Sequence, residues 1–170
     1  MLPMQNLKAG AAAAMLALCA ITVPAQAQVL PTRPVPLTEL FSAWKAICYD
    51  NRFDTDAQIR IAKSAPFGVV EGEPDEDGTR EFKGEAMLVW ISGGAKNHYC
   101  AVAGNLTQAV TTADGEALLV PLIGKPSETE GERMFWELDK PDHKFTVGYG
   151  SGNTKDGIPG ALIGSGVDMK

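Results

Sequence analysis

The sequence predicts an α+β domain in which two N-terminal helices pack on an antiparallel sheet of about four strands. Two observations lead to this fold class. Early in the chain, apolar residues recur at helical spacing, and later they form runs of strand length bounded by glycine-rich turns. Helices followed by two hairpins, with one short helix between the hairpins, are typical of a two-layer α+β domain.

Residues 1–27 have the pattern of a secretory signal peptide. Lys8 precedes an apolar stretch over 9–23, and Ala25-Gln26-Ala27 is an A-x-A cleavage pattern. The apolar stretch is too short to cross a bilayer, which takes about 20 residues. We therefore expect cleavage near Ala27 and a mature protein that is periplasmic or secreted, with no membrane span. A lipoprotein with Cys19 as the lipidated residue is disfavoured, because the bulky Leu18 precedes Cys19 inside the apolar stretch.

Residues 28–36 contain three prolines and predict an extended leader with no stable fold of its own. A single small domain then occupies 37–170. Its first helix is predicted from Leu37 to Cys48, with Pro36 at the start and Thr38 as the cap.

A second helix is predicted over 56–64. Asp54 or Thr55 caps it, and Pro66 stops it. An acidic loop follows over 71–80.

Four later segments predict strands, and they pair as two hairpins. These segments are 85–91, 98–103, 133–138 and 144–149. Between the hairpins, residues 116–123 fit either a short helix capped by Thr112 or Asp114 or a buried strand, and we favour the helix. The glycine-rich C-terminal region is expected to be a loop with a short strand at 161–163. Three tryptophans, Trp44, Trp90 and Trp136, fall on the predicted apolar faces and are expected in the core.

Two cysteines remain after the predicted cleavage, Cys48 and Cys100. An even pair in an oxidising compartment predicts a disulfide, here between the first helix and the sheet. Closing a loop of this length stabilises a domain by about 4 kcal/mol in the chain-entropy model. A redox or metal-binding pair is disfavoured because the sequence has no C-x-x-C spacing.

The formal net charge is −6 at pH 7, and removing Lys8 with the signal makes the mature chain more acidic. Nucleic acids and anionic membranes bind clustered Lys and Arg. The composition therefore argues against both as partners.

Motifs for chemistry are weak throughout the chain. The acids Glu73, Asp75 and Asp77 follow the first half of a calcium loop, but Gly84 stands where the last acid belongs, so we favour a solvated acidic loop without metal. The two histidines, His98 and His143, are read as ordinary surface or strand residues. No G-x-S-x-G elbow and no cofactor fingerprint is present.

Residues 148–155 alternate glycine with polar side chains after a predicted strand. No helix opens behind this segment, so it lacks the dipole that favours phosphate. We predict a surface loop and place the partner contact there, on Tyr149, Ser151, Asn153 and Lys155.

These observations predict a non-enzymatic binding or accessory module for a protein or an envelope component, without a cofactor. The rival hypothesis is a small hydrolase of an envelope polymer that uses paired carboxylates. The acids available for that role are Glu71, Glu73, Asp75, Asp114 and Glu116.

Overall fold

The computed structural model describes residues 31–94 and 97–170; the predicted signal peptide and the first three residues of the leader lie outside this range. The helices are α1 (Leu37–Trp44), the π-helix η2 (Lys45–Tyr49), α2 (Thr55–Ala62) and α3 (Thr112–Ile123). The strands are β1 (Val70–Glu71), β2 (Arg80–Lys83), β3 (Leu88–Gly93), β4 (Asn97–Asn105), β5 (Glu128–Glu130), β6 (Arg133–Asp139), β7 (His143–Asn153) and β8 (Pro159–Met169).

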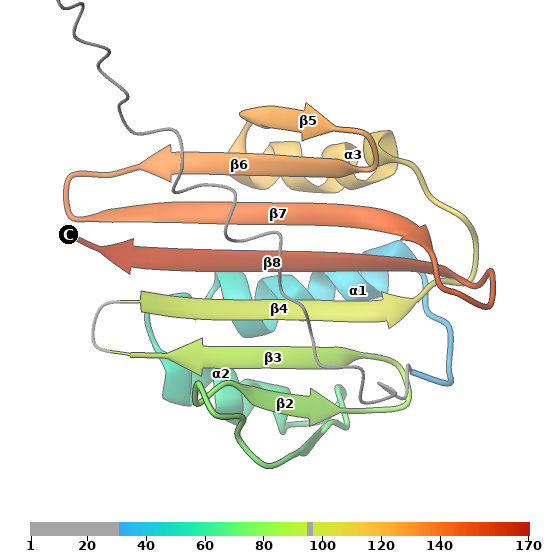
Figure 1. The fold of residues 1–170 in the computed structure, drawn as a ribbon, viewed down its shortest axis with the longest axis horizontal. Coiled ribbons are helices and arrows are strands. Elements are labelled where there is room, and N and C mark those ends of the chain that lie inside the picture. Colours follow the sequence, from blue (N-terminus) through green and yellow to red (C-terminus); the bar gives the residue numbers. More distant parts are fainter. Residues whose placement is uncertain (1–30, 95–96) are drawn as a thin grey trace, which may run out of the picture.

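All eight strands form one antiparallel sheet in the order β1-β2-β3-β4-β8-β7-β6-β5. Figure 1 shows the helices α1, α2 and α3 together behind this sheet. The α+β class and the two layers agree with the sequence prediction. The expected number of about four strands is wrong, because the sheet also contains β1, β2, β5 and β8.

The largest correction concerns the glycine-rich C-terminal region, which the sequence predicts as a loop. It forms β8, which lies between β4 and β7 and pairs with β7 from Pro159 to Met169. The preceding segment was also predicted as a loop from Gly148, yet β7 continues to Asn153. Glycine weakens an isolated strand, but a strand hydrogen-bonded on both sides is held by its neighbours. This tertiary support is not visible in local propensity.

The first helix follows the prediction in extent and direction. It begins at Leu37 with Pro36 as N-cap, so Thr38 lies inside the first turn and the predicted cap there is wrong. The helix continues into η2, whose buried face carries Cys48. Helix α2 is capped by Asp54, whose carboxylate accepts the Ala57 amide at 2.8 Å, as its sequence predicts.

The ambiguous segment 116–123 is part of a helix, α3, which begins four residues earlier, at Thr112. Its N-cap is Thr111, and the Asp114 carboxylate accepts the Thr111 amide at 2.7 Å and the Thr111 hydroxyl at 2.8 Å. These two hydrogen bonds lower the pKa of Asp114. Gly115 faces the sheet, where a Cβ atom would lie 2.5 Å from Cζ of Tyr149, so the helix approaches the sheet at a distance that only glycine permits.

The described part of the predicted extended leader, residues 31–36, is anchored to the domain. Val35 forms a parallel bridge with Leu106 and is completely buried. The Val35 amide donates to the Asn105 carbonyl, and the Thr107 amide donates to the Val35 carbonyl. The segment therefore adds a short stretch of pairing at the end of β4.

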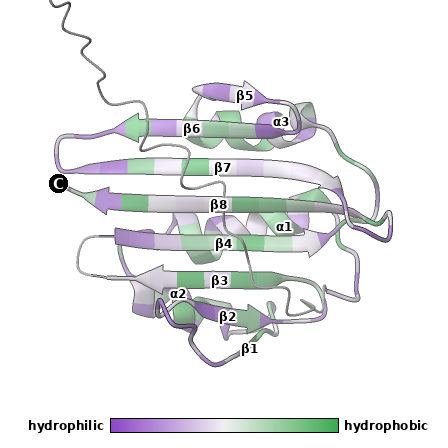
Figure 2. Cartoon of the chain, viewed as in Figure 1, coloured by the Kyte–Doolittle hydropathy of each residue, from purple (hydrophilic) through white to green (hydrophobic). Residues whose placement is uncertain are grey.

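The main core lies between the helices and the sheet. Trp44 and Trp136 are buried in it, as predicted, together with residues from every helix and from the inward-facing positions of the strands. Trp90 departs from the prediction, because it is only half-buried and lies on the other face of β3. In Figure 2, the hydrophilic residues concentrate in loops, in the outer strands β2 and β5, and where β7 begins and β8 ends.

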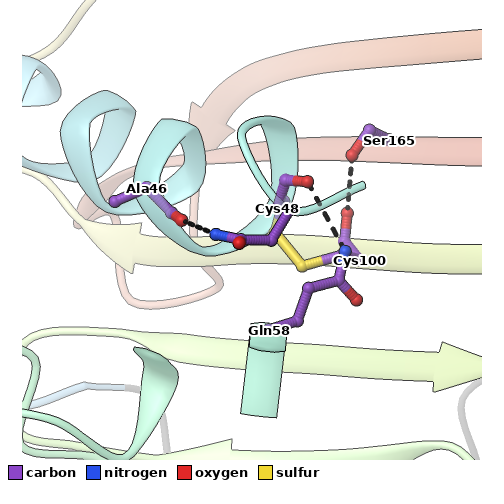
Figure 3. The surroundings of a disulfide bond; sticks show 6 residues. Ala46, Cys48, Gln58, Cys100 and Ser165 are labelled. Atoms are coloured by element: carbon purple, nitrogen blue, oxygen red, sulfur yellow. Dashed lines mark hydrogen bonds between the residues drawn. A yellow bond between two sulfur atoms is a disulfide. The ribbon is translucent and has the colours of Figure 1, made fainter. Parts of the chain in front are cut away.

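A disulfide joins Cys48 to Cys100, which confirms the predicted pairing, and it ties η2 to β4 (Figure 3). Both cysteines are buried. Their backbone carbonyls accept hydrogen bonds from buried side chains, Gln58 Nε2 to Cys48 and Ser165 Oγ to Cys100, each at 3.4 Å. The bond thus lies at the junction of two helices and two strands.

None of the helices in residues 31–94 and 97–170 combines the length and the apolar character that crossing a membrane requires.

We expect the double variant Cys48→Ala, Cys100→Ala to have a free energy of unfolding about 4 kcal/mol lower than that of the oxidised wild type. The two cysteines are 52 positions apart, and without the disulfide the chain between them is no longer closed into a loop in the unfolded state. Urea unfolding followed by circular dichroism measures the change. The reduced wild-type chain is the matched control and should unfold at a similar urea concentration. A double variant as stable as the oxidised wild type would contradict this role.

Gly115→Ala should destabilise the domain although alanine is the better helix former. Helix propensity favours alanine by about 1 kcal/mol, whereas forcing the new methyl group against the Tyr149 ring costs about 1–3 kcal/mol. Thermal unfolding measures the balance. In a Tyr149→Leu background, which removes the opposing ring, the same change should be neutral or stabilising. A gain of stability in the wild-type background would show that the close approach of α3 is unimportant.

Candidate binding surface

The two faces of the sheet differ in what covers them. Successive residues of a strand point to opposite faces. Cys100 points toward the helices because it is bonded to Cys48 of η2, so its neighbours Tyr99 and Ala101 point away. We call the side on which Tyr99 and Ala101 lie the helix-free face. The strand register then assigns each residue of the neighbouring strands to this face or to the helix side.

Six glycines occupy the helix-free face of the two central strands. We call them the glycine patch: Gly148, Gly150 and Gly152 of β7, and Gly160, Gly164 and Gly166 of β8. Two pairs, Gly148 with Gly164 and Gly152 with Gly160, are direct cross-strand partners. On the opposite side the same two strands carry large side chains such as Tyr149, Ile163 and Val167. On the helix-free face these two strands therefore carry glycine at six positions, with Thr146 and Leu162 among them, and on the other face they carry a packed core.

Aromatic side chains flank the patch on both sides. One register row across the sheet runs Trp90, Ala101, Gly164, Gly148 and Phe135. All three aromatic residues of this face, Trp90, Tyr99 and Phe135, are half-buried. They offer partly exposed ring surface next to the bare backbone.

Part of the patch is explained by the internal packing of these rings. The Tyr99 hydroxyl would lie 3.5 Å from a Cβ atom on Gly164, and Phe135 Cδ1 would lie 3.7 Å from one on Gly148. Aromatic rings that lean over a cross-strand glycine compensate for its missing side chain. These two glycines thus have a structural role.

Other glycines of the patch have no such neighbour. A Cβ atom on Gly150 would meet only Arg133 Cγ at 3.8 Å, and one on Gly160 would meet only the Gly104 carbonyl at 3.4 Å. A larger residue at Gly150 fits without displacing anything, and would strengthen the strand. Glycine inside a strand often marks a place where a ligand or another backbone approaches closely. Gly150 and Gly160 fit this description.

Charged side chains on the helix-free face lie beside the patch: Arg133 is the direct cross-strand partner of Gly150, and two further pairs form ion pairs. Lys144 contacts Glu137 at 2.9 Å toward one edge of the sheet, and Lys83 contacts Glu81 at 3.1 Å toward the other. Between them the patch carries no charged side chain. Burial raises the pKa of the Tyr99 phenol above its ordinary value of 10.0, so this side chain stays neutral. The region therefore combines neutral glycine and aromatic surface with the cation of Arg133 at its edge.

The residues predicted to contact a partner lie on the helix side of β7, at its end and in the following turn. Tyr149 is 2 % exposed, on the helix side, with its hydroxyl donating to the Thr111 carbonyl at 3.4 Å. Ser151 also lies on the helix side of β7, whereas Asn153 and Lys155 are exposed at its end and in the following turn. The residues between them, Gly148, Gly150 and Gly152, form half of the patch. Glycine alternates with larger residues over 148–152. In a strand this alternation puts the glycines on one face and Tyr149 and Ser151 on the other.

In the acidic loop, the Asp75 side chain is used in hydrogen bonds to the backbone of the loop itself. Asp75 Oδ1 accepts the Asp77 amide at 3.0 Å and the Thr79 amide at 2.7 Å, and Gly78 takes a positive φ. Glu73 and Asp77 are exposed. Within residues 31–94 and 97–170, no group of three or more His, Cys, Asp or Glu side chains is arranged to hold a metal ion.

The remaining titratable residues have ordinary partners. His98 Nδ1 lies 3.0 Å from the Thr55 hydroxyl, and His143 Nδ1 lies 2.8 Å from Asp142. Glu71 is bound by Lys63 and Arg80, each at 2.7 Å, and hydrogen bonds to these cations lower its pKa. A general acid of a hydrolase needs a raised pKa, and neither Glu71 nor Asp114 has one.

A second surface lies on the outer side of α3. Its residues Ala113, Glu116, Ala117, Val120 and Pro121 line a shallow cavity of about 350 Å³. A helix with apolar residues on every side is usually buried on every side, yet only Gly115 and Leu119 of α3 are buried. This exposed apolar side distinguishes α3 from α1, whose apolar residues mostly face the core.

Comparison with known proteins identifies no relative: no family model, no curated protein and no solved structure matches the chain.

Proposed function

We propose that the protein is an exported, non-enzymatic binding module that engages a protein or an envelope component through the helix-free face of its sheet. One observation carries the proposal: the glycine patch between half-exposed aromatic residues, with glycines at Gly150 and Gly160 that the internal packing does not require. A partner is therefore expected to reach the backbone of β7 and β8.

The chemistry of the face supports binding through its aromatic rings and exposed backbone. Aromatic rings supply large contact area with little conformational entropy to lose. Lys144 is already paired with Glu137, whereas Arg133, beside Gly150, offers a cation to a partner. The patch leaves space above the backbone, and the flanking Trp90, Tyr99 and Phe135 define its width.

Export is the other half of the proposal. The charged, apolar and A-x-A segments of residues 1–27 support a cleaved signal peptide. The buried Cys48–Cys100 disulfide fits a compartment outside the reducing cytoplasm. These two features together support periplasmic or secreted residence.

The hydrolase alternative is less well supported. It needs two carboxyl groups across one substrate, one of them with a raised pKa. Asp114 is used in the cap of α3, Glu71 is paired with two cations, and both pKa values are lowered. We therefore place the function in binding.

Gly150→Thr should abolish or strongly weaken partner binding while leaving the fold as stable or more stable. Threonine favours the strand by up to about 1 kcal/mol, but its side chain stands where the partner would approach the backbone. Co-sedimentation of the purified mature chain with an isolated bacterial envelope fraction measures binding, and thermal unfolding measures stability.

Lys125→Thr, an exposed change on the loop after α3, is the matched control and should bind like the wild type. Trp90→Ala should weaken binding in the same assay. If the wild type binds and Gly150→Thr binds equally well, the helix-free face is not the binding surface.

A further inference from the structure

Two aromatic rings lie over glycines at the centre of the helix-free face. Tyr99 reaches from β4 toward Gly164 of β8, where its hydroxyl and Cε2 would lie 3.5 and 3.7 Å from a Cβ atom. Phe135 reaches from β6 over its direct partner Gly148 of β7, where Cδ1 and Cε1 would each lie 3.7 Å from a Cβ atom. Gly164 and Gly148 are cross-strand partners of each other. The two rings, which we call the aromatic platform, therefore converge from opposite sides on adjacent positions.

The glycines beneath the platform keep it close to the sheet. A bulky side chain at Gly164 or Gly148 would occupy the space that the Tyr99 or Phe135 ring now fills. Both rings are half-buried, so each is still partly open to solvent. The helices α1, α2 and α3 all lie behind the sheet in Figure 1 and do not cover this side. The centre of the face is therefore a low aromatic surface.

The backbone beneath the platform is already paired on both sides. Strand β7 lies between β6 and β8, and β8 lies between β4 and β7. An extended peptide that joins a sheet needs a free edge, where it pairs with unused N–H and C=O groups. A ligand of the platform is therefore held by contact with rings and glycines, and by polar side chains around them.

The polar side chains around the platform carry both signs of charge. Arg133 is exposed, lies two positions before Phe135 on the same face and has Glu130 as its direct cross-strand partner. Lys144 is paired with Glu137. Polyanions bind clustered cations, whereas the formal net charge of this chain is −6. The surroundings of the platform thus suit a ligand rich in hydroxyl groups better than a polyanion.

A sugar polymer has the chemistry that these features require. The flat side of a pyranose ring carries C–H groups, which are attracted to the negative face of an aromatic ring, and its hydroxyl groups point outward around the ring. We propose that the partner of the helix-free face is a glycan strand, with one sugar stacked on Tyr99 and Phe135. The strand continues over Gly150 and Gly160, and Arg133 donates hydrogen bonds to its oxygen atoms. This identification rests on the proposed binding function and narrows it to one class of ligand.

Co-sedimentation with stripped cell-wall glycan tests the class of ligand. The probe is insoluble bacterial wall material freed of lipid with detergent and of protein with protease. The wild-type mature chain should bind it, and Tyr99→Leu and Phe135→Leu should each bind about tenfold more weakly, because leucine still covers the glycine but has no flat ring face. Phe53→Leu is the matched control and should bind like the wild type, since Phe53 is an exposed ring that packs on His143 instead. Thermal unfolding of each variant confirms that it is folded.

Tryptophan fluorescence tests where the glycan binds. Trp44 and Trp136 are at most 2 % exposed, so acrylamide quenching reports mainly on Trp90, which lies in the register row of Gly164 and Gly148. The soluble probe is glycan cut from the same wall material by a glycosidase and freed of its peptides by an amidase. It should reduce the quenching of Trp90, and the released peptides should not.

The outcomes separate this inference from the proposed function. Binding to the whole envelope fraction without binding to the stripped glycan would overturn the inference and leave the binding function in place. Equal binding by the two ring variants, glycan binding that leaves Trp90 unprotected, or protection by the released peptides alone would each overturn it as well. A wild-type chain that binds neither the envelope fraction nor the glycan would refute both proposals.

Discussion

The fold depends on the pairing of β8 with β4 and β7. Without β8 the sheet consists of two separate antiparallel units, β1 to β4 and β5 to β7, that are not hydrogen-bonded to each other. The last strand of the chain joins them and carries Ile163, Ser165 and Val167 into the core. The helices follow from this arrangement, because α1 packs across β4 and β8 while α3 packs on β6 and β7. The hydrophobic core is continuous only when the two units are joined.

The disulfide reinforces this same centre. Cys100 is the direct cross-strand partner of Ser165 on β8, and the Ser165 hydroxyl bonds to the Cys100 carbonyl. The covalent bond to Cys48 therefore fixes the helical layer to β4 where β4 meets the joining strand. An oxidised chain keeps the helices in register with the sheet even where glycine-rich strands contribute little intrinsic stability.

The sequence predicted the elements whose residues act locally. The apolar spacing of Leu40, Trp44 and Ile47 gave the first helix, and Asp54 gave the cap of the second. The disulfide followed from cysteine number and compartment. Only residues 161–163 of β8 were predicted as a strand, because Gly160, Gly164 and Gly166 carry no local strand signal and are held by pairing with β4 on one side and β7 on the other. The candidate surface was missed for the same reason. A glycine becomes part of a binding face only when strand register places it beside another glycine and between aromatic residues. The segment was recognised as a candidate, and the structure adds that Tyr149 points to the core whereas its glycine neighbours point outward.

The position of β8 also has a consequence for how the protein is made. A chain that emerges from its N-terminus can form both sheet units before its last residues are available. Until then β4 and β7 are edges with unpaired backbone groups, and each has one strongly apolar face, a combination that promotes association with other chains. The nascent protein therefore keeps two apolar edge strands until β8, eleven residues long, has been synthesised and can pair with both.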